Sequence, residues 1–338
     1  GIKAENIYLW ADTVISPIFK YIVFYFITYN MVEKNGYKKY LNTIYWGNLI
    51  LIISALYVDL VTKKNFFYRS NDRGDLAGFI ILFFIGYLLM KDIKLYKKFL
   101  ALIGISAGII AFVITYSRGA TLGVISCFYF LLMIFLWKKY REKVNKKIII
   151  ISVIGIIILS FVLTPIVLPD RIVNRFKGIK NIDSSWSLKG RLLMWKSGLL
   201  MIKNNPLLGI GLGNFNSRFL YYVDNIFEID IPSGMRWHNK PHNLFIYIAA
   251  EQGIPSLFIG LIIFFKSFLL SLNNFIDKNN KSILGFILTG MFVIIFVHSF
   301  VDTTFLYGNV GFYLILILVF NIHLRDQKNE KLSIERSD

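Results

Sequence analysis

The sequence predicts an all-α polytopic membrane protein, with about nine or more transmembrane helices and one long extracytoplasmic loop that contains an amphipathic helix. Of its 338 residues, 56% are hydrophobic and only 17% are charged, whereas ordinary soluble domains have about 25% charged residues. Apolar runs of about 18 residues or more recur along the chain, and each is long enough to cross a bilayer as a helix. Together these observations exclude an ordinary soluble domain.

The apolar runs predict nine spans, of which the third and the ninth are short for a bilayer. They divide the chain into helices one to six (1–168), a polar loop that we expect to be catalytic (169–253), helices seven to nine (254–324) and a cytoplasmic tail (325–338). The expected spans cover 14–32, 43–61, 76–90, 99–116, 120–137, 148–168, 254–272, 283–301 and 310–324.

Basic residues set the predicted orientation. The segments after spans one, three, five, seven and nine carry 19 lysines and arginines, and the opposite short segments carry six. Cytoplasmic loops are the ones enriched in these residues, so the formal charge of +18 indicates membrane anchoring rather than nucleic-acid binding. The turn at Arg118 and the segment 169–253 are therefore expected on the outer face.

Residues 188–204 of the loop predict an amphipathic helix, with Ser187 as a cap and Pro206 just past its end. We expect this helix to lie in the membrane interface with Trp195 at headgroup depth. Arg191 would face away from the apolar side, toward lipid phosphates or a substrate. The predicted apolar face consists of Leu192, Trp195, Leu199 and Ile202.

The glycine-rich run 209–213 follows this helix. No strand precedes it, so a nucleotide-binding fold is improbable, and the glycines are expected to allow a tight reversal or a close backbone approach beneath a ligand. Residues 214–241 mix aromatic rings with polar side chains, Arg218 among them. That mixture suits sugar binding and equally suits a loop folded onto the membrane.

Two histidines of the loop are candidates for chemistry. His242 adjoins the apolar pattern that begins at Leu244 and is favoured over His238, because a rigid helix start positions a side chain better than a loop. Its imidazole could act as a base or as a donor. His298 and Asp302, four residues apart near the outer end of the eighth span, are expected to share a helix face. They are either a functional pair or a mutually satisfied structural one. No cluster of residues predicts a metal site, and no cofactor is expected.

Five motifs in order carry a resemblance to a known family. They are Ser117-Arg118-Gly119, Gly190-Arg191…Trp195, Asn205-Pro206-Leu207-Leu208-Gly209 continuing to Phe215, His242-Asn243…Glu251-Gln252-Gly253 and His298…Asp302. Over about residues 100–310 they resemble the bacterial O-antigen ligase and O-antigen polymerase superfamily. Nine spans are fewer than the ten to fourteen usual in that superfamily.

The resemblance implies a GT-C kind of membrane fold and a metal-independent, inverting glycosyltransferase. Its donor glycan would be carried by undecaprenyl pyrophosphate, and its active site would face the periplasm or the cell exterior from the bacterial cytoplasmic membrane. The other implied partners are a glycan acceptor, the bilayer and further polysaccharide-assembly proteins, and nucleic acid is not among them.

The resemblance also assigns residue roles. Arg118 and Arg191 match the two arginines associated with the pyrophosphate, and His242 matches the essential loop histidine, either as a base or as a pyrophosphate ligand. The candidates for substrate binding are Glu251, Asp302, His298, Arg218 and Trp195.

Several functions remain open from the sequence. The first is a repeat-unit polymerase for capsule or O-antigen. The Ile-, Lys- and Asn-rich composition slightly favours it over a ligase, because it hints at an AT-rich genome and makes conceivable a Gram-positive source, which would lack lipopolysaccharide. A transporter or flippase of lipid-linked sugars is the alternative of another class; it predicts internal repeats and charges at mid-bilayer, neither of which is seen. The last open possibility is a structural or sensory membrane protein.

Overall fold

The computed structural model describes residues 22–30, 37–62, 66, 71–90, 93–140, 186–231, 233, 236, 240–276 and 282–303, and scattered positions between 313 and 323. All the secondary structure in these residues is helical. The chain divides into two compact units, which are described separately. The first holds the described residues 186–264 and 298–303, and the second holds the remainder.

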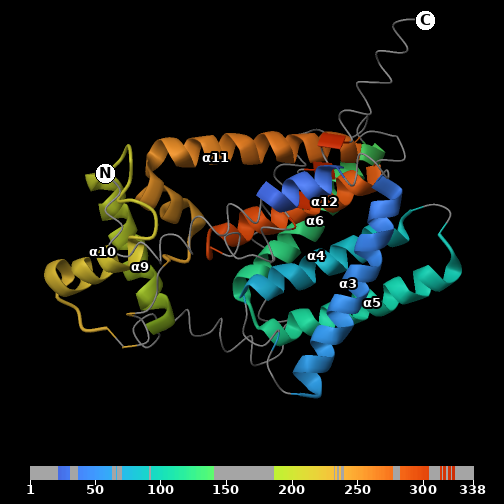
Figure 1. Ribbon diagram of the computed structural model, residues 1–338, viewed down its shortest axis with the longest axis horizontal. Helices are drawn as coiled ribbons and strands as arrows, with labels where there is room; N and C mark the ends of the chain where they lie inside the picture. The colour runs from blue at the N-terminus through green and yellow to red at the C-terminus, as the bar shows by residue number, and fades with distance from the viewer. Residues whose placement is uncertain are drawn as a thin grey trace, which may run out of the picture. The chain divides into compact units, whose positions relative to one another are not determined.

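The second unit is built around a buried helix. It contains α3 (Tyr37–Leu60), α4 (Asn71–Leu88), α5 (Leu95–Thr115), α6 (Arg118–Tyr140) and most of α12 (Ser282–Ser299). Helix α4 packs against α3, α5 and α6 (Figure 1). Glycines of α5 allow the close approach: a Cβ on Gly108 would lie 2.7 Å from the Ile81 side chain, and small residues at such interfaces bring helix backbones together.

Four of the described helices are long and apolar enough to cross a membrane: Leu41–Leu60, Leu95–Thr115, Arg118–Trp137 and Leu244–Ile276. A shorter apolar helix covers Ile283–Ser299. They show a polytopic helical membrane protein, but they do not establish the predicted nine or more spans. The predicted span 148–168 lies outside the described residues, and only scattered positions of 310–324 lie within them.

The predicted third span, 76–90, corresponds to α4, which starts five residues earlier than predicted. Helix α4 begins at Asn71 and has Asp72, Arg73 and Asp75 near its start. Most of its later side chains are buried inside the unit. Its apolar run therefore packs against the other helices of the unit, and its three charged residues set it apart from the four candidate spans.

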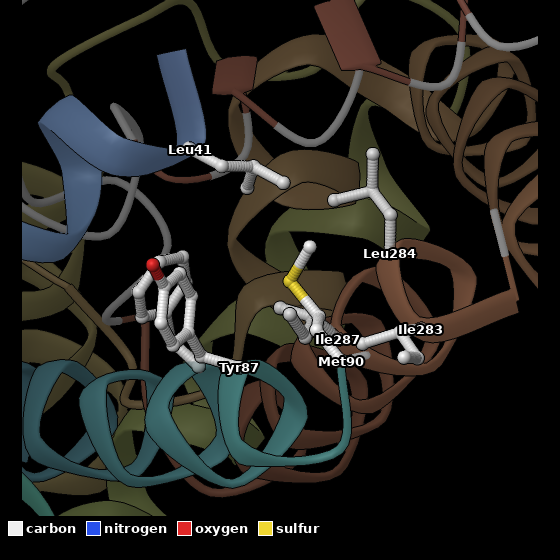
Figure 2. A pocket seen from close by; sticks show the side chains of 7 residues that line it. Leu41, Tyr87, Met90, Ile283, Leu284 and Ile287 are labelled. Atoms are coloured by element: carbon white, nitrogen blue, oxygen red, sulfur yellow. The ribbon is translucent and has the colours of Figure 1, made fainter. Parts of the chain in front are cut away.

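A small apolar pocket opens between α3, α4 and α12 (Figure 2). None of the side chains that line it is charged, and Tyr87 is the one titratable residue among them. The lining residues are Leu41, Phe83, Tyr87, Met90, Ile283, Leu284 and Ile287.

The first unit has its own core. It contains α9 (Trp186–Asn204), α10 (Phe215–Tyr222), the π-helix η3 (Val223–Phe227) and the first part of α11 (Leu244–Ile276). The side chains of Leu193, Leu200, Ile202, Ile210, Leu220 and Phe227 pack against its buried cluster. That cluster consists of Met194, Met201, Phe215, Phe219, Tyr222, Val223, Ile231, Tyr247 and Ala250.

Helix α9 confirms the predicted helix and adds a second apolar side, which is buried. Met194 and Met201 are buried, whereas Leu192 and Leu199 are 46% and 57% exposed. Ser187 lies inside the helix, which begins one residue earlier, so it is not the cap. The apolar residues of α9 occupy more than one side, and the choice of buried side was made by packing against α10.

The aromatic residues after the glycine run also differ from expectation. Phe215 and Phe219 have no exposed surface and Tyr222 is 7% exposed. These rings form the core and do not offer a face to a sugar, whereas Tyr221 is exposed.

Helix α11 begins ten residues before the predicted seventh span and bends at Gly253 (φ 85°, ψ 166°). Its first part, from Leu244, is turned away from the long part that continues to Ile276 (Figure 1). The long part alone, at about 1.5 Å a residue, measures about 35 Å, enough to cross the hydrocarbon core of a bilayer. The shorter first part belongs to the core of the first unit.

Candidate functional site

Two side chains of α9 reach from the helix to neighbouring backbone. Arg191 Nη1 donates to the carbonyl oxygen of Val301 at 2.8 Å, and Trp195 Nε1 donates to that of Pro241 at 2.8 Å. Residues four apart lie on one face of a helix, so Arg191 and Trp195 face the same way, contrary to the prediction that they diverge. Trp195 thereby fixes the chain immediately before His242.

His242 is presented at the start of α11 in a strained backbone conformation. Its φ of 51° is in the left-handed region, which few non-glycine residues adopt, histidine more often than most. The next residue, Asn243, caps α11: its Oδ1 accepts from Ile246 N at 3.0 Å, and its Nδ2 donates to Phe300 O at 2.9 Å. The cap and the tether to Phe300 hold His242 in place.

Asp302 meets His242 rather than sharing a helix face with His298. Helix α12 ends at Ser299, and the backbone N–H groups of Val301 and Asp302 both donate to the carbonyl oxygen of His298. This turn brings the Asp302 carboxylate within 3.0 Å of His242 Nδ1. The expectation of a shared helix face was wrong, because the helix ends before the fourth residue.

The carboxylate of Asp302 is ionised and almost wholly buried, with 3% of its side chain exposed. Burial alone would raise its pKa. The hydrogen bond from His242, the nearby His242 and His298 rings and the 2.7 Å bond from Thr303 N outweigh burial and hold the pKa well below its usual range. An ionised carboxylate can only accept, so His242 Nδ1 carries the hydrogen in this contact.

Two cationic side chains lie in the same part of the unit. Burial lowers the pKa of Arg191 and the charge of Asp302 opposes that shift. Burial likewise lowers the pKa of Lys240, against the charges of Glu251 and Asp302. Sequence reasoning missed Lys240, and its position two residues before His242 was the only available signal.

Thr303 is a second residue that sequence reasoning missed. It has no exposed surface, and among the described residues its Oγ1 atom has no hydrogen-bond partner. A buried hydroxyl without a partner costs stability. No sequence signal distinguished this threonine from its neighbour Thr304.

Glu251 is 1% exposed, and its carboxylate accepts hydrogen bonds from two backbone N–H groups. Its Oε1 accepts from Phe215 N at 2.9 Å and its Oε2 from Gly213 N at 3.0 Å. These N–H groups lie at the first turn of α10, where a helix has unsatisfied donors and a partial positive charge. Glu251 therefore caps α10 from another helix.

The glycine run lies against the backbone of α11. Gly209, Gly211 and Gly213 all have positive φ, and Ile210 N and Gly211 N donate to the carbonyl oxygens of Ala250 and Glu251. A Cβ on Gly209 would lie 2.3 Å from the Glu251 carbonyl carbon. The predicted close backbone approach is confirmed, and its partner is the bend of α11.

Three further candidates are described, Arg118 in the second unit and Arg218 and His298 in the first. Arg118 is the first residue of α6 in the second unit, where Ser117 Oγ accepts from Ala120 N at 3.2 Å and caps the helix. Arg218 is exposed on α10 and makes none of the contacts above. His298 is 1% exposed near the end of α12. His238 lies outside the described residues.

Fold and site together define a polytopic helical membrane protein that holds a buried carboxylate–imidazole pair beside cationic side chains. A family model described as O-antigen ligase matches residues 103–265, which include Arg118, Arg191 and His242. This match supports the O-antigen ligase and polymerase superfamily that the motifs predicted. A comparison with curated proteins found no match.

The match supports a glycosyltransferase-like membrane enzyme of polysaccharide biosynthesis that acts on lipid-linked glycans. Asp302 lies beyond the matched region, and the fold brings it to His242.

Proposed function

We propose that this protein transfers oligosaccharide from undecaprenyl pyrophosphate on the outer face of the bacterial cytoplasmic membrane, as a repeat-unit polysaccharide polymerase. The observation that carries the proposal is the 3.0 Å contact of His242 Nδ1 with the buried carboxylate of Asp302, within the unit that also holds Arg191. A carboxylate that orients an imidazole in this way is a recurrent means of preparing a general base.

In the proposed reaction, Nε2 of His242 takes the proton of an acceptor sugar hydroxyl. The hydroxyl oxygen forms a bond to the anomeric carbon of the donor as the bond from that carbon to the phosphate oxygen breaks. The electron pair of the broken bond leaves with the pyrophosphate, and entry opposite the leaving group inverts the anomeric carbon. Asp302 stabilises the imidazolium that forms.

The leaving pyrophosphate gains negative charge, and we assign Arg191 and Arg118 to it. One N–H of Arg191 is bound to Val301, and a guanidinium has five N–H donors in all. Arg118 stands at the N-terminus of α6, where a helix favours anions. Removing one such charged donor is expected to cost about 3 kcal/mol, or about 100-fold in rate.

Alanine substitutions of Arg118, Arg191 and His242 test the proposal, with polysaccharide length measured in cells and membrane level checked. Lys203→Ala, an exposed position on α9, is the matched control and should leave polymer length unchanged. Loss of polymer with accumulation of single lipid-linked units supports a polymerase. Accumulation of long lipid-linked polymer identifies a ligase, which differs in its acceptor. Full-length chains from all three well-expressed variants would show that the protein is not this enzyme.

A further inference from the structure

Two consecutive leucines project from the turn between α9 and the glycine run. Leu207 is 69% exposed and Leu208 is 85% exposed, although the residues on both sides of them are held in place. Single exposed leucines are ordinary on protein surfaces. This pair is different, because backbone hydrogen bonds hold its turn against α11, a helix long enough to cross a membrane.

The turn is rigidly attached to the bend of α11. Gly209 N donates to Asn205 O at 3.0 Å and closes the turn, and Ile254 N donates to Pro206 O at 2.8 Å. A Cβ on Gly253 would lie 2.0 Å from the carbonyl oxygen of Leu207. The leucines are thus held outward by backbone contacts that leave their side chains out of the core.

The neighbouring surface is the apolar side of a membrane-spanning helix. Ile254, to which the turn is bound, is the first residue after the bend, and the next turns of α11 expose four large apolar side chains. One helical turn, about 5 Å, separates Ile254 from the first of them. The four are Phe258, Ile259, Ile262 and Ile263, each between 53% and 61% exposed.

We propose that Leu207 and Leu208 insert into the acyl chains of the bilayer at the point where α11 enters it. The occupant of this surface is lipid, because the leucine tip continues the apolar surface of α11, a helix long enough to cross a membrane. Burial of apolar side chains at the boundary of headgroups and acyl chains is favourable. Insertion of Leu207 and Leu208 into the acyl chains does not require Leu192 and Leu199, which are exposed on α9, to insert as well.

The tip sets the depth of the first unit in the membrane. The first part of α11 runs from the bend back to His242, about 13 Å of helix at 1.5 Å a residue. This consequence rests on the proposed function, since a lipid-linked donor carries its pyrophosphate at the membrane surface. The depth of the tip itself does not depend on any activity.

Site-directed labelling tests the proposal without turnover. The single cysteine, Cys127, has no exposed surface, so a cysteine introduced at Leu208 can carry an environment-sensitive fluorophore. The protein is placed in vesicles of phosphatidylethanolamine and phosphatidylglycerol, with doxyl-labelled lipid as the membrane quencher and iodide as the aqueous one. Asp230→Cys, at an exposed position of the same unit, is the matched control.

The label on Leu208→Cys should show blue-shifted emission, quenching by doxyl lipid and loss of quenching by iodide, whereas the label on Asp230→Cys should be quenched by iodide. Equal iodide quenching at both positions would overturn the proposal. A label shielded from both quenchers would also overturn it and would indicate a second copy of the chain. Either result would leave the polymer-length test of the proposed function unaffected.

Discussion

At the scale of single residues, the His242–Asp302 pair joins two segments 60 residues apart. Asp302 Oδ1 accepts from the imidazole and from the N–H of Thr303, and negative charge on the carboxylate strengthens both contacts. His242 keeps a left-handed backbone conformation to make this contact. A costly conformation held by a buried charge pair is typical of a functional site.

Asp302→Asn is expected to lower polymerisation by about 100-fold or more, because general acid–base catalysis contributes about 10²–10⁴-fold. The amide keeps the shape but removes the charge that stabilises the imidazolium. Rates with purified lipid-linked donor check this, and Asp230→Asn, at an exposed position, should retain the wild-type rate. A rate within a few-fold of wild type in Asp302→Asn would exclude the general-base role.

The lowered pKa of Asp302 also predicts a dependence of stability on pH. A carboxyl group with a lowered folded pKa stabilises the folded state above its unfolded pKa, and this contribution is lost as pH falls through the folded value. The advantage of wild type over Asp302→Asn in thermal unfolding should therefore be constant above about pH 5 and shrink below the ordinary aspartate value of about 3.9. An advantage that persisted undiminished into strong acid would contradict the assignment.

Thr303→Val is expected to leave stability unchanged or to raise it by up to about 1 kcal/mol. The hydroxyl is buried and has no partner among the described residues, and replacing an unsatisfied polar group by an apolar one of the same shape is neutral or favourable. Thermal unfolding in detergent measures the change. Thr303→Ser, which keeps the hydroxyl and loses a methyl group, should be less stable than wild type, and a clear loss of stability in Thr303→Val would reveal a hydrogen bond.

At the scale of elements, the bend of α11 organises the first unit. Gly253 and Gly209 let the turn after α9 lie against the helix backbone, and Glu251, one turn before Pro255, caps α10. The glycine run 209–213, Glu251 and Gly253 thus pack together as one assembly. It supports the segment that carries His242.

Gly253→Ala is expected to destabilise the protein by at least about 2 kcal/mol, because it combines a left-handed φ with a clash against backbone. Gly260→Ala, in the same helix with no atom within 4 Å of the added Cβ, should be neutral or more stable by up to about 1 kcal/mol. Thermal unfolding of both variants makes the comparison. Equal stabilities would mean that the bend is not fixed by Gly253.

At the scale of the whole molecule, the two units have different tasks. The second holds the buried helix α4 and three of the four described helices that are long and apolar enough to cross a membrane, and the first holds the charged side chains around His242. The distribution of basic residues predicts that the first unit faces the cell exterior.

A membrane-impermeant thiol reagent tests this orientation in intact cells. The label should reach Asp230→Cys directly and Lys98→Cys only after permeabilisation; both positions are exposed. Cys127 is buried and should give little background. The reverse pattern would place the His242 site in the cytoplasm and rule out an outer-face enzyme.

The sequence by itself determined the membrane class, the existence of α9 and the close approach of the glycine run. These follow from local composition, helical periodicity and the conformational freedom of glycine, all of which act over a few residues. Only the tertiary structure decided which face of α9 is buried, that Asp302 meets His242 and that Glu251 caps α10. Such choices depend on contacts between segments distant in the chain, where the packing of one surface against another overrides the local pattern.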